Sequence, residues 1–199
     1  MKPVRIRRHL RRRVYAPTWT TQGFRVKSRV RSTLPKQAWC PRGFIVGEFL
    51  ELEHQGLAYG TGFKPQNAIW TSTWTKDKSY MSEWHERMRD IAGFEQPQTE
   101  ECFVLVPRKN LRIYEIDNRD NLVWLVNNYS LDGVPLERRT EGTLDWGKIT
   151  KDFDAVHLTK RGQLATLSGI PNLWGWDVES TAWLRPAKTF EAYIGGIDR

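Results

Sequence analysis

A pair of acidic side chains near the end of the chain, Asp177 and Glu179, is the feature most typical of catalysis. The surrounding residues predict a strand over 174–184, and residues two apart on a strand project from the same face. Two carboxylates on one face repel and desolvate each other, which raises the pKa of one of them. Without a nearby cation this arrangement costs stability, so we interpret both as candidate catalytic residues. The alternative is a solvated strand face.

Two further segments carry small polar residues that a packed core does not require. Residues 70–74 read Trp-Thr-Ser-Thr-Trp, and they predict a strand on which Ser72 faces away from Thr71 and Thr73. Residues 56–62 place three glycines around Tyr59, which allows a ligand to approach the backbone closely. We therefore expect ligand-binding groups among these residues: Tyr59, Gly60, Thr61, Ser72, Thr73 and Trp74.

The spacing of other reactive residues does not support further chemistries. The stretch from Gly142 to Lys148 approaches a phosphate-binding loop, but Ile149 stands where a Ser or Thr would hold magnesium. The four histidines lack metal-ligand spacing, and the two cysteines form no zinc motif. We expect no metal, and we interpret His157, between Val156 and Leu158, as a structural core residue.

Taken in chain order, these segments resemble the ADP-ribosyltransferase superfamily. The resemblance implies a split mixed β-sheet with NAD bound in its cleft. It puts Glu179, preceded by Asp177, in the place of the Glu that holds the ribose hydroxyl, and Ser72 on the strand that scaffolds the nicotinamide pocket. The resemblance leaves either Arg42 or Tyr59 at the position of the family's first NAD-binding residue. More closely, residues 70–74, 154–159 and 174–184 resemble a group of uncharacterised actinobacterial and phage proteins, which implies an origin and no function.

The chemistry that this resemblance implies is cleavage of the bond between nicotinamide and ribose. An oxocarbenium-like cation develops as that bond breaks, as in glycoside cleavage. A carboxylate beside the ribose stabilises the cation and orients the 2′-hydroxyl. Trp70, Trp74 or Trp176 could sandwich the nicotinamide, although tryptophans at these positions also suit a core. NAD is thus the expected substrate.

The charge distribution separates an N-terminal arm from the rest of the chain. The formal net charge is +8. Residues 1–42 hold 13 Lys and Arg and no acidic residue, so the remainder is 31 − 13 = 18 basic against 23 acidic residues. Such an arm typically neutralises phosphates, so we expect nucleic acid or another polyanion as partner, the alternatives being a solvated tail or docking to an acidic protein surface. The expected contact residues are Arg5, Arg7, Arg8, Arg11, Arg12, Arg13, Arg25, Lys27 and Arg29.

The order of elements in residues 43–199 predicts a single α+β domain, a split mixed β-sheet with two or three flanking helices. We expect strands at 68–74, 102–107, 111–116, 155–159 and 174–184, and helices at 79–91, 119–129 and 145–153, the last two capped by Asp117 and Asp145. Residues 24–30 alternate apolar and basic, as in an edge strand.

Two main hypotheses for function follow from these patterns, beside a third in which the protein is a toxin or NAD-hydrolysing enzyme with water as the acceptor. The first is an NAD-dependent ADP-ribosyltransferase-like enzyme whose arm holds a nucleic-acid or nucleic-acid-bound target. The second is a non-enzymatic nucleic-acid-binding or phage structural protein that acts through the arm. No apolar run reaches the length of a membrane span, so we expect a cytoplasmic protein without membrane contact. Binding of NAD separates the two hypotheses.

Overall fold

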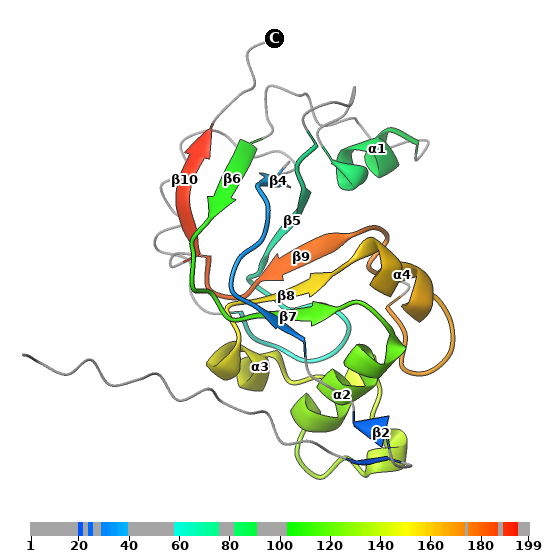
Figure 1. Ribbon diagram of the computed structural model, residues 1–199. Coiled ribbons are helices and arrows are strands. Elements are labelled where there is room, and N and C mark those ends of the chain that lie inside the picture. Colours follow the sequence, from blue (N-terminus) through cyan, green and yellow to red (C-terminus); the bar gives the residue numbers. More distant parts are fainter. Residues whose placement is uncertain are drawn as a thin grey trace, which may run out of the picture.

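The chain of 199 residues was analysed as a computed structural model (Figure 1). The structure describes residues 20–21, 24–25, 29–39, 58–75, 82–90, 103–173, 175–186 and 189–194. These residues form an α+β fold in which helices flank a curled, mixed sheet, as the sequence predicts.

The sheet joins strands that are far apart in the sequence. The strand order is β10-β6-β4-β5-β9-β8-β7-β3, in which β7 and β8 pair in parallel and the other neighbours are antiparallel. Figure 1 shows β10 and β6 running steeply across the direction of β9, β8 and β7, so the sheet bends where β4 and β5 join the two halves. The strands are β3 (Val30–Arg31), β4 (Gln37–Trp39), β5 (Ile69–Thr73), β6 (Phe103–Pro107), β7 (Ile113–Ile116), β8 (Ala155–Leu158), β9 (Ser180–Trp183) and β10 (Phe190–Ile194); β1 (Thr20–Thr21) and β2 (Phe24–Arg25) form a separate pair.

The helices begin at residues whose side chains satisfy free backbone amides. Asp145 accepts a hydrogen bond from the backbone amide of Lys148 at 3.0 Å, which confirms its predicted role as a cap. The cap of the preceding α-helix is Asn118 and not Asp117, because Asn118 accepts from the amide of Asn121 at 3.0 Å. The helices are α1 (Glu83–Asp90), α2 (Arg119–Tyr129), α3 (Trp146–Asp152) and α4 (Lys160–Thr166), with short 3₁₀ turns at Leu136–Arg138 and Glu141–Thr143.

The two faces of β7, β8 and β9 have different environments. One face packs against apolar residues of α2 and α3, among them Leu122, Leu125, Trp146 and Ile149. The opposite face holds a second apolar cluster at one end of these strands, formed by Ile69, Leu105, Ile113, Ala155, Trp183 and the partly buried Phe190. Further along the same face the apolar side chains give way to polar ones, and this change locates the candidate site.

The prediction of a long strand over 174–184 is wrong, because only Ser180–Trp183 is strand. The backbone amide of Trp176 bonds to the carbonyl of Leu173 at 2.8 Å, which closes a turn before the strand begins. The buried indole of Trp176 packs in the α3-side core, with its ring 6.4 Å from that of Trp146. Asp177 and Glu179 therefore precede the strand and do not share one strand face.

The sheet extends into the region that the sequence assigns to the basic arm and linker. β3 pairs with β7 at one edge of the sheet, and β4 lies between β5 and β6. Leu34, between these two strands, is buried in the second apolar cluster. Residues 29–39 thus belong to the folded body, so the boundary placed at residue 42 is too late. Two elements that the sequence analysis did not anticipate, α4 and β10, complete the fold.

None of the helices in the described part of the chain combines the length and the apolar character that a membrane crossing requires.

Candidate functional site

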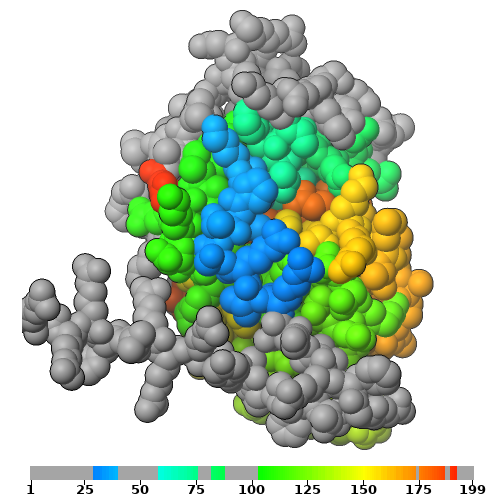
Figure 2. All heavy atoms as spheres, in the orientation of Figure 1, coloured from blue at the N-terminus to red at the C-terminus, as the bar shows by residue number. Residues whose placement is uncertain are grey.

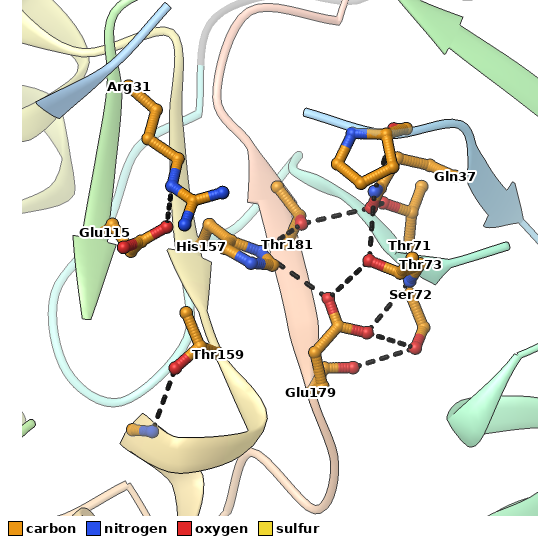
Figure 3. Close-up of polar contacts among 12 residues, drawn as sticks. Arg31, Gln37, Thr71, Ser72, Thr73, Glu115, His157, Thr159, Glu179 and Thr181 are labelled. Atoms are coloured by element: carbon orange, nitrogen blue, oxygen red, sulfur yellow. Dashed lines mark hydrogen bonds and ion pairs between the residues drawn. The ribbon is translucent and has the colours of Figure 1, made fainter. Parts of the chain in front are cut away.

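A row of polar side chains crosses the sheet on one face, beyond the apolar cluster of that face (Figure 3). Strand register aligns its members: Thr71 lies opposite Thr181, Thr181 opposite His157, and His157 beside Glu115 on the parallel neighbour. Gln37 of β4 extends the row on the other side of β5. All five residues are buried, and buried polar groups persist only where they are hydrogen-bonded or paired.

Glu179 lies in this row, held by donors from β5. The Ser72 hydroxyl donates to its Oε2 at 2.8 Å, and the Thr73 backbone amide donates to the same oxygen at 2.9 Å. The Thr73 hydroxyl donates to Oε1 at 3.0 Å. The carboxylate is therefore fixed between two adjacent residues of β5, and Glu179 keeps only 8% of its surface exposed.

Ser72 and Thr73 both reach Glu179, although adjacent strand residues face opposite sides. This is because Glu179 precedes β9 and is not held in the strand ladder. The Ser72 hydroxyl also lies 2.9 Å from the Glu179 carbonyl oxygen, so its single hydrogen is shared between the backbone and the side chain of Glu179. The expectation that Ser72, Thr73 and Glu179 belong to one site agrees with this geometry.

Burial is the main cause of the altered ionisation of Glu179. Desolvation raises the pKa of this carboxyl above its usual value, while the hydrogen bonds from Thr73 and Ser72 oppose the rise. The nearby charge of Glu83 on α1 raises the pKa further. The sequence argument assigned the rise to mutual repulsion and desolvation of Asp177 and Glu179. That cause is wrong, because Asp177 is exposed and does not contribute to the shift.

His157 sits beside Glu179, on β8. Its Nδ1 lies 2.9 Å from the Thr181 hydroxyl and 3.5 Å from Glu179 Oε1. Burial lowers the pKa of His157 to about 4, and the positive charge of Arg31 lowers it as well, so the ring is neutral near pH 7. The sequence analysis interpreted His157 as structural. It is indeed a buried strand residue, and it also contacts the candidate catalytic carboxylate.

The segment that carries Glu179 lies between α1 and α4 (Figure 2). Figure 2 shows the orange atoms of the segment 175–183 set back between the green atoms of α1 and the yellow atoms of β8 and α4. At the rim, the Lys160 ammonium of α4 lies 2.5 Å from the Glu83 carboxylate of α1. An ion pair thus joins the two helices beside this segment.

Asp177 does not share the environment of Glu179. Its side chain is exposed, and its backbone carbonyl accepts a hydrogen bond from Gln163 of α4 at 2.5 Å. The backbone of Asp177 thus tethers the loop to α4, and its carboxylate faces solvent at the edge of the site. This position does not support the common strand face that the sequence predicts for the two carboxylates.

Three predicted binding residues, Tyr59, Gly60 and Thr61, lie away from Glu179. The amide of Ala58 bonds to the carbonyl of Leu184, at the end of β9 opposite to Glu179. Five residue steps of extended chain span about 16 Å. Tyr59 is 57% exposed, and Gly60 accepts a hydrogen bond from the backbone amide of Trp146 at 3.0 Å. The structure therefore does not bring this segment together with the carboxylate, and Arg42, the other candidate for the first place, lies outside the described residues.

The tryptophans considered for nicotinamide have other contacts. Trp70 and Trp176 pack edge to face, 4.7 Å between ring centroids, in the helix-side core. Trp74 packs against Ala38 and Val104, and the Lys36 ammonium lies 5.2 Å from its ring centroid. These contacts assign Trp70 and Trp176 to the core, and Trp74 to the face of β4 opposite Gln37.

Of the expected polyanion contacts, the structure describes the side chain of Arg29 and the backbone of Arg25. Arg29 lies 2.5 Å from Glu115 and also pairs with Asp117, and Arg31 pairs with Glu115 as well. Arg161 of α4 is a further partner of Asp117. Arg29 therefore docks β3 onto the sheet through carboxylates. The remaining expected contacts, Arg5, Arg7, Arg8, Arg11, Arg12, Arg13 and Lys27, lie outside the described residues.

Sequence reasoning did not identify Gln37 and Thr181 as members of the site. The spacing of Thr181 two residues after Glu179, and of Thr71 two residues before Thr73, is a period-two signal that could have placed them on one face. Gln37 carries no such signal, because it lies among prolines in an apparent linker.

Among the residues that the structure describes, no group of three or more His, Cys, Asp or Glu side chains is placed to hold a metal ion. No protein-family model, no curated protein and no solved structure matches the chain.

Proposed function

We propose that this protein is an NAD-dependent ADP-ribosyltransferase-like enzyme that uses Glu179 as its catalytic carboxylate. The observation that supports this proposal is the convergence of the Ser72 hydroxyl and the two Thr73 donors on the Glu179 carboxylate. A Ser-containing strand beside a late Glu is the arrangement on which the sequence resemblance rests.

The chemistry follows from a fixed negative charge in a low-dielectric site. The bond between the nicotinamide nitrogen and ribose C1′ breaks, nicotinamide leaves with the bonding electrons, and positive charge develops on the ribose. A preorganised carboxylate stabilises that charge more strongly than solvent does. The Glu179 oxygens also accept from the ribose 2′-hydroxyl, and an acceptor nucleophile then bonds to C1′ and loses its proton.

Burial of Glu179 supports this role. An ionised buried carboxylate costs stability, and the raised pKa shows that the hydrogen bonds do not fully offset the cost. Groups held at such a cost are frequent in functional sites. We propose that the substrate enters between α1 and α4, which flank the segment that carries Glu179 (Figure 2).

We propose nucleic acid, or a protein bound to nucleic acid, as the acceptor. Arg29 and Arg31 are occupied by carboxylates of the body, so this contact depends on the basic residues before them, of which Arg5 to Arg13 form the densest cluster. The expected setting is the cytoplasm of a bacterium or of a phage-infected cell.

The experiment is to incubate the full chain with NAD in which the adenine or the nicotinamide is labelled, with and without DNA, RNA and a protein extract. The proposal predicts release of nicotinamide and transfer of the adenine label to a nucleic-acid or nucleic-acid-bound acceptor. Release without transfer would limit the protein to NAD hydrolysis. Binding of nucleic acid with no effect on NAD would leave a non-enzymatic nucleic-acid-binding protein.

A further inference from the structure

The hydrogen-bond directions in the polar row can be assigned from Gln37 outward. The Nε2 of Gln37 lies 3.2 Å from the Pro35 carbonyl oxygen, and the reverse orientation of the amide would set two oxygens against each other. The Oε1 of Gln37 therefore faces Thr71 and Thr181, at 2.8 Å and 3.1 Å. An amide oxygen only accepts, so both hydroxyls donate to it.

Each hydroxyl has a single hydrogen, so its oxygen must accept from its other neighbour. For Thr71 that neighbour is the indole nitrogen of Trp183 at 2.7 Å, which is always a donor. For Thr181 it is Nδ1 of His157 at 2.9 Å. The proton of the neutral imidazole is thus on Nδ1.

Two branches from Gln37 end on the same carboxylate oxygen. In the first, Gln37 Nε2 lies 3.4 Å from the Thr73 hydroxyl, which donates to Glu179 Oε1. In the second, the Thr181 hydroxyl accepts from the Nδ1–H of His157, and this bond fixes the ring so that Nδ1 lies 3.5 Å from the same Oε1 (Figure 3). The carboxylate therefore has hydrogen-bond donors on the β5 side and contacts the His157 ring on the β8 side.

We propose that His157, as the neutral Nδ1–H tautomer oriented by Thr181 and Gln37, is a positioning residue that holds the Glu179 carboxylate in its reactive orientation. That the held orientation is the reactive one rests on the proposed function. The tautomer and the positioning of the carboxylate rest on the hydrogen-bond directions alone. His157 contacts Glu179, and through this contact it acts on the reaction by way of the carboxylate.

The charged groups around His157 and Glu179 come from three elements, β3, β7 and α1. Arg31 on β3 lowers the pKa of His157, and Asp117 at the end of β7 raises it. Glu115 on β7 lies in register with His157, and Glu83 on α1 acts on Glu179. A pH experiment on this pair must account for these groups, which the variants below leave unchanged.

The tautomer is tested directly by nitrogen NMR of the full chain labelled in histidine, with the His157 signals assigned by their loss in His157→Asn. We expect a protonated Nδ1 and an unprotonated Nε2 near pH 7. A protonated Nε2 would overturn the inference, whether or not the protein cleaves NAD.

Two variants separate positioning from bulk structure. Asn at 157 places an amide donor where Nδ1 stands, whereas Gln moves its amide to the place of Nε2. The pKa of the Glu179 carboxyl is measured by carbon NMR. We expect this pKa to be higher in His157→Gln than in the wild type, and to lie close to the wild-type value in His157→Asn. In NAD cleavage, we expect His157→Gln to lower kcat about 10-fold with little change in KM, and His157→Asn to recover most of that loss.

The outcomes distinguish this inference from the proposed function. Equal behaviour of the Asn and Gln variants in the Glu179 titration would overturn the positioning role. A wild-type protein that leaves NAD intact would refute the proposed function, while the tautomer and the titration would still decide whether His157 positions Glu179.

Discussion

Acidification should destabilise the protein through His157. The unfolded chain binds a proton at this residue below about pH 6.5, whereas the folded protein resists protonation until its pKa of about 4. Because the folded-state pKa is depressed, the stability is present above the unfolded pKa and is lost as the pH falls through this window. This difference between the folded and unfolded pKa of His157 implies a loss of about 2 kcal/mol between about pH 7 and about pH 5, and about 3 kcal/mol in full.

The assay is urea unfolding of the wild type and of His157→Asn across that range. The wild type should lose about 2 kcal/mol more than the variant, because Asn does not titrate. Glu179 acts with the opposite sign: its raised pKa means that its protonation stabilises the fold as the pH falls. The comparison of the wild type with His157→Asn should therefore be repeated with Glu179→Gln present in both proteins. This substitution removes the contribution of Glu179 and any coupling between the two groups.

A difference between wild type and variant that stays flat between about pH 7 and about pH 5 in both backgrounds would refute the reasoning, since it would mean that His157 titrates alike in the folded and unfolded chains.

Two further predictions concern the N-terminal segment and one helix. Deletion of residues 1–28 should leave the unfolding free energy nearly unchanged and weaken nucleic-acid binding at low salt. Deletion of 1–34 also removes Arg29, Arg31 and the buried Leu34, and it should cost at least about 3 kcal/mol of stability because Glu115 is then buried without its partners. Equal stability of the two deletion variants in urea would contradict the placement of β3. Asp145→Ala removes the cap of α3 and should lower the unfolding free energy in urea by about 1 kcal/mol. Asp145→Asn keeps a cap oxygen and should lower it less. Identical losses of unfolding free energy in the two variants would argue against the capping interaction.

Local patterns predicted much of the fold because they depend on neighbouring residues. The strand at 69–73 follows from β-branched and aromatic residues, and the cap of α3 follows from Asp145 immediately before a helical apolar spacing. The α+β class follows from the order of such elements. None of these depends on which distant segments pair.

Features that depend on pairing could not be predicted in the same way. β4 pairs between β5 and β6, which come much later in the chain, and the flanking prolines make it resemble a linker. The start of β9 depends on the packing of Trp176 into the α3-side core, which no local pattern reports. The placement of Tyr59 far from Glu179 likewise follows from its neighbour Ala58 bonding to Leu184.

The meeting of Ser72 with Glu179 was expected from the resemblance, and the reason for it is geometric. The register of β5 against β9 sets Thr71 opposite Thr181, so the residues just beyond the ladder are also adjacent. The prediction about Asp177 failed because it assumed a strand where the chain turns. Members of the site on β4 and β8 became visible only once the sheet order was known.

The most direct test of the central claim is nicotinamide release from NAD by the wild type, Glu179→Gln and Ser72→Ala, with circular dichroism as the folding control. Gln preserves the volume of Glu179 and can still accept from Thr73, but it lacks the charge that faces the developing cation. The account predicts release by the wild type, a loss of about 100- to 1,000-fold in Glu179→Gln, and a smaller loss in Ser72→Ala, with all three proteins folded. A wild type that neither binds nor cleaves NAD, with or without nucleic acid, or a Glu179→Gln variant that cleaves NAD at the wild-type rate, would contradict it.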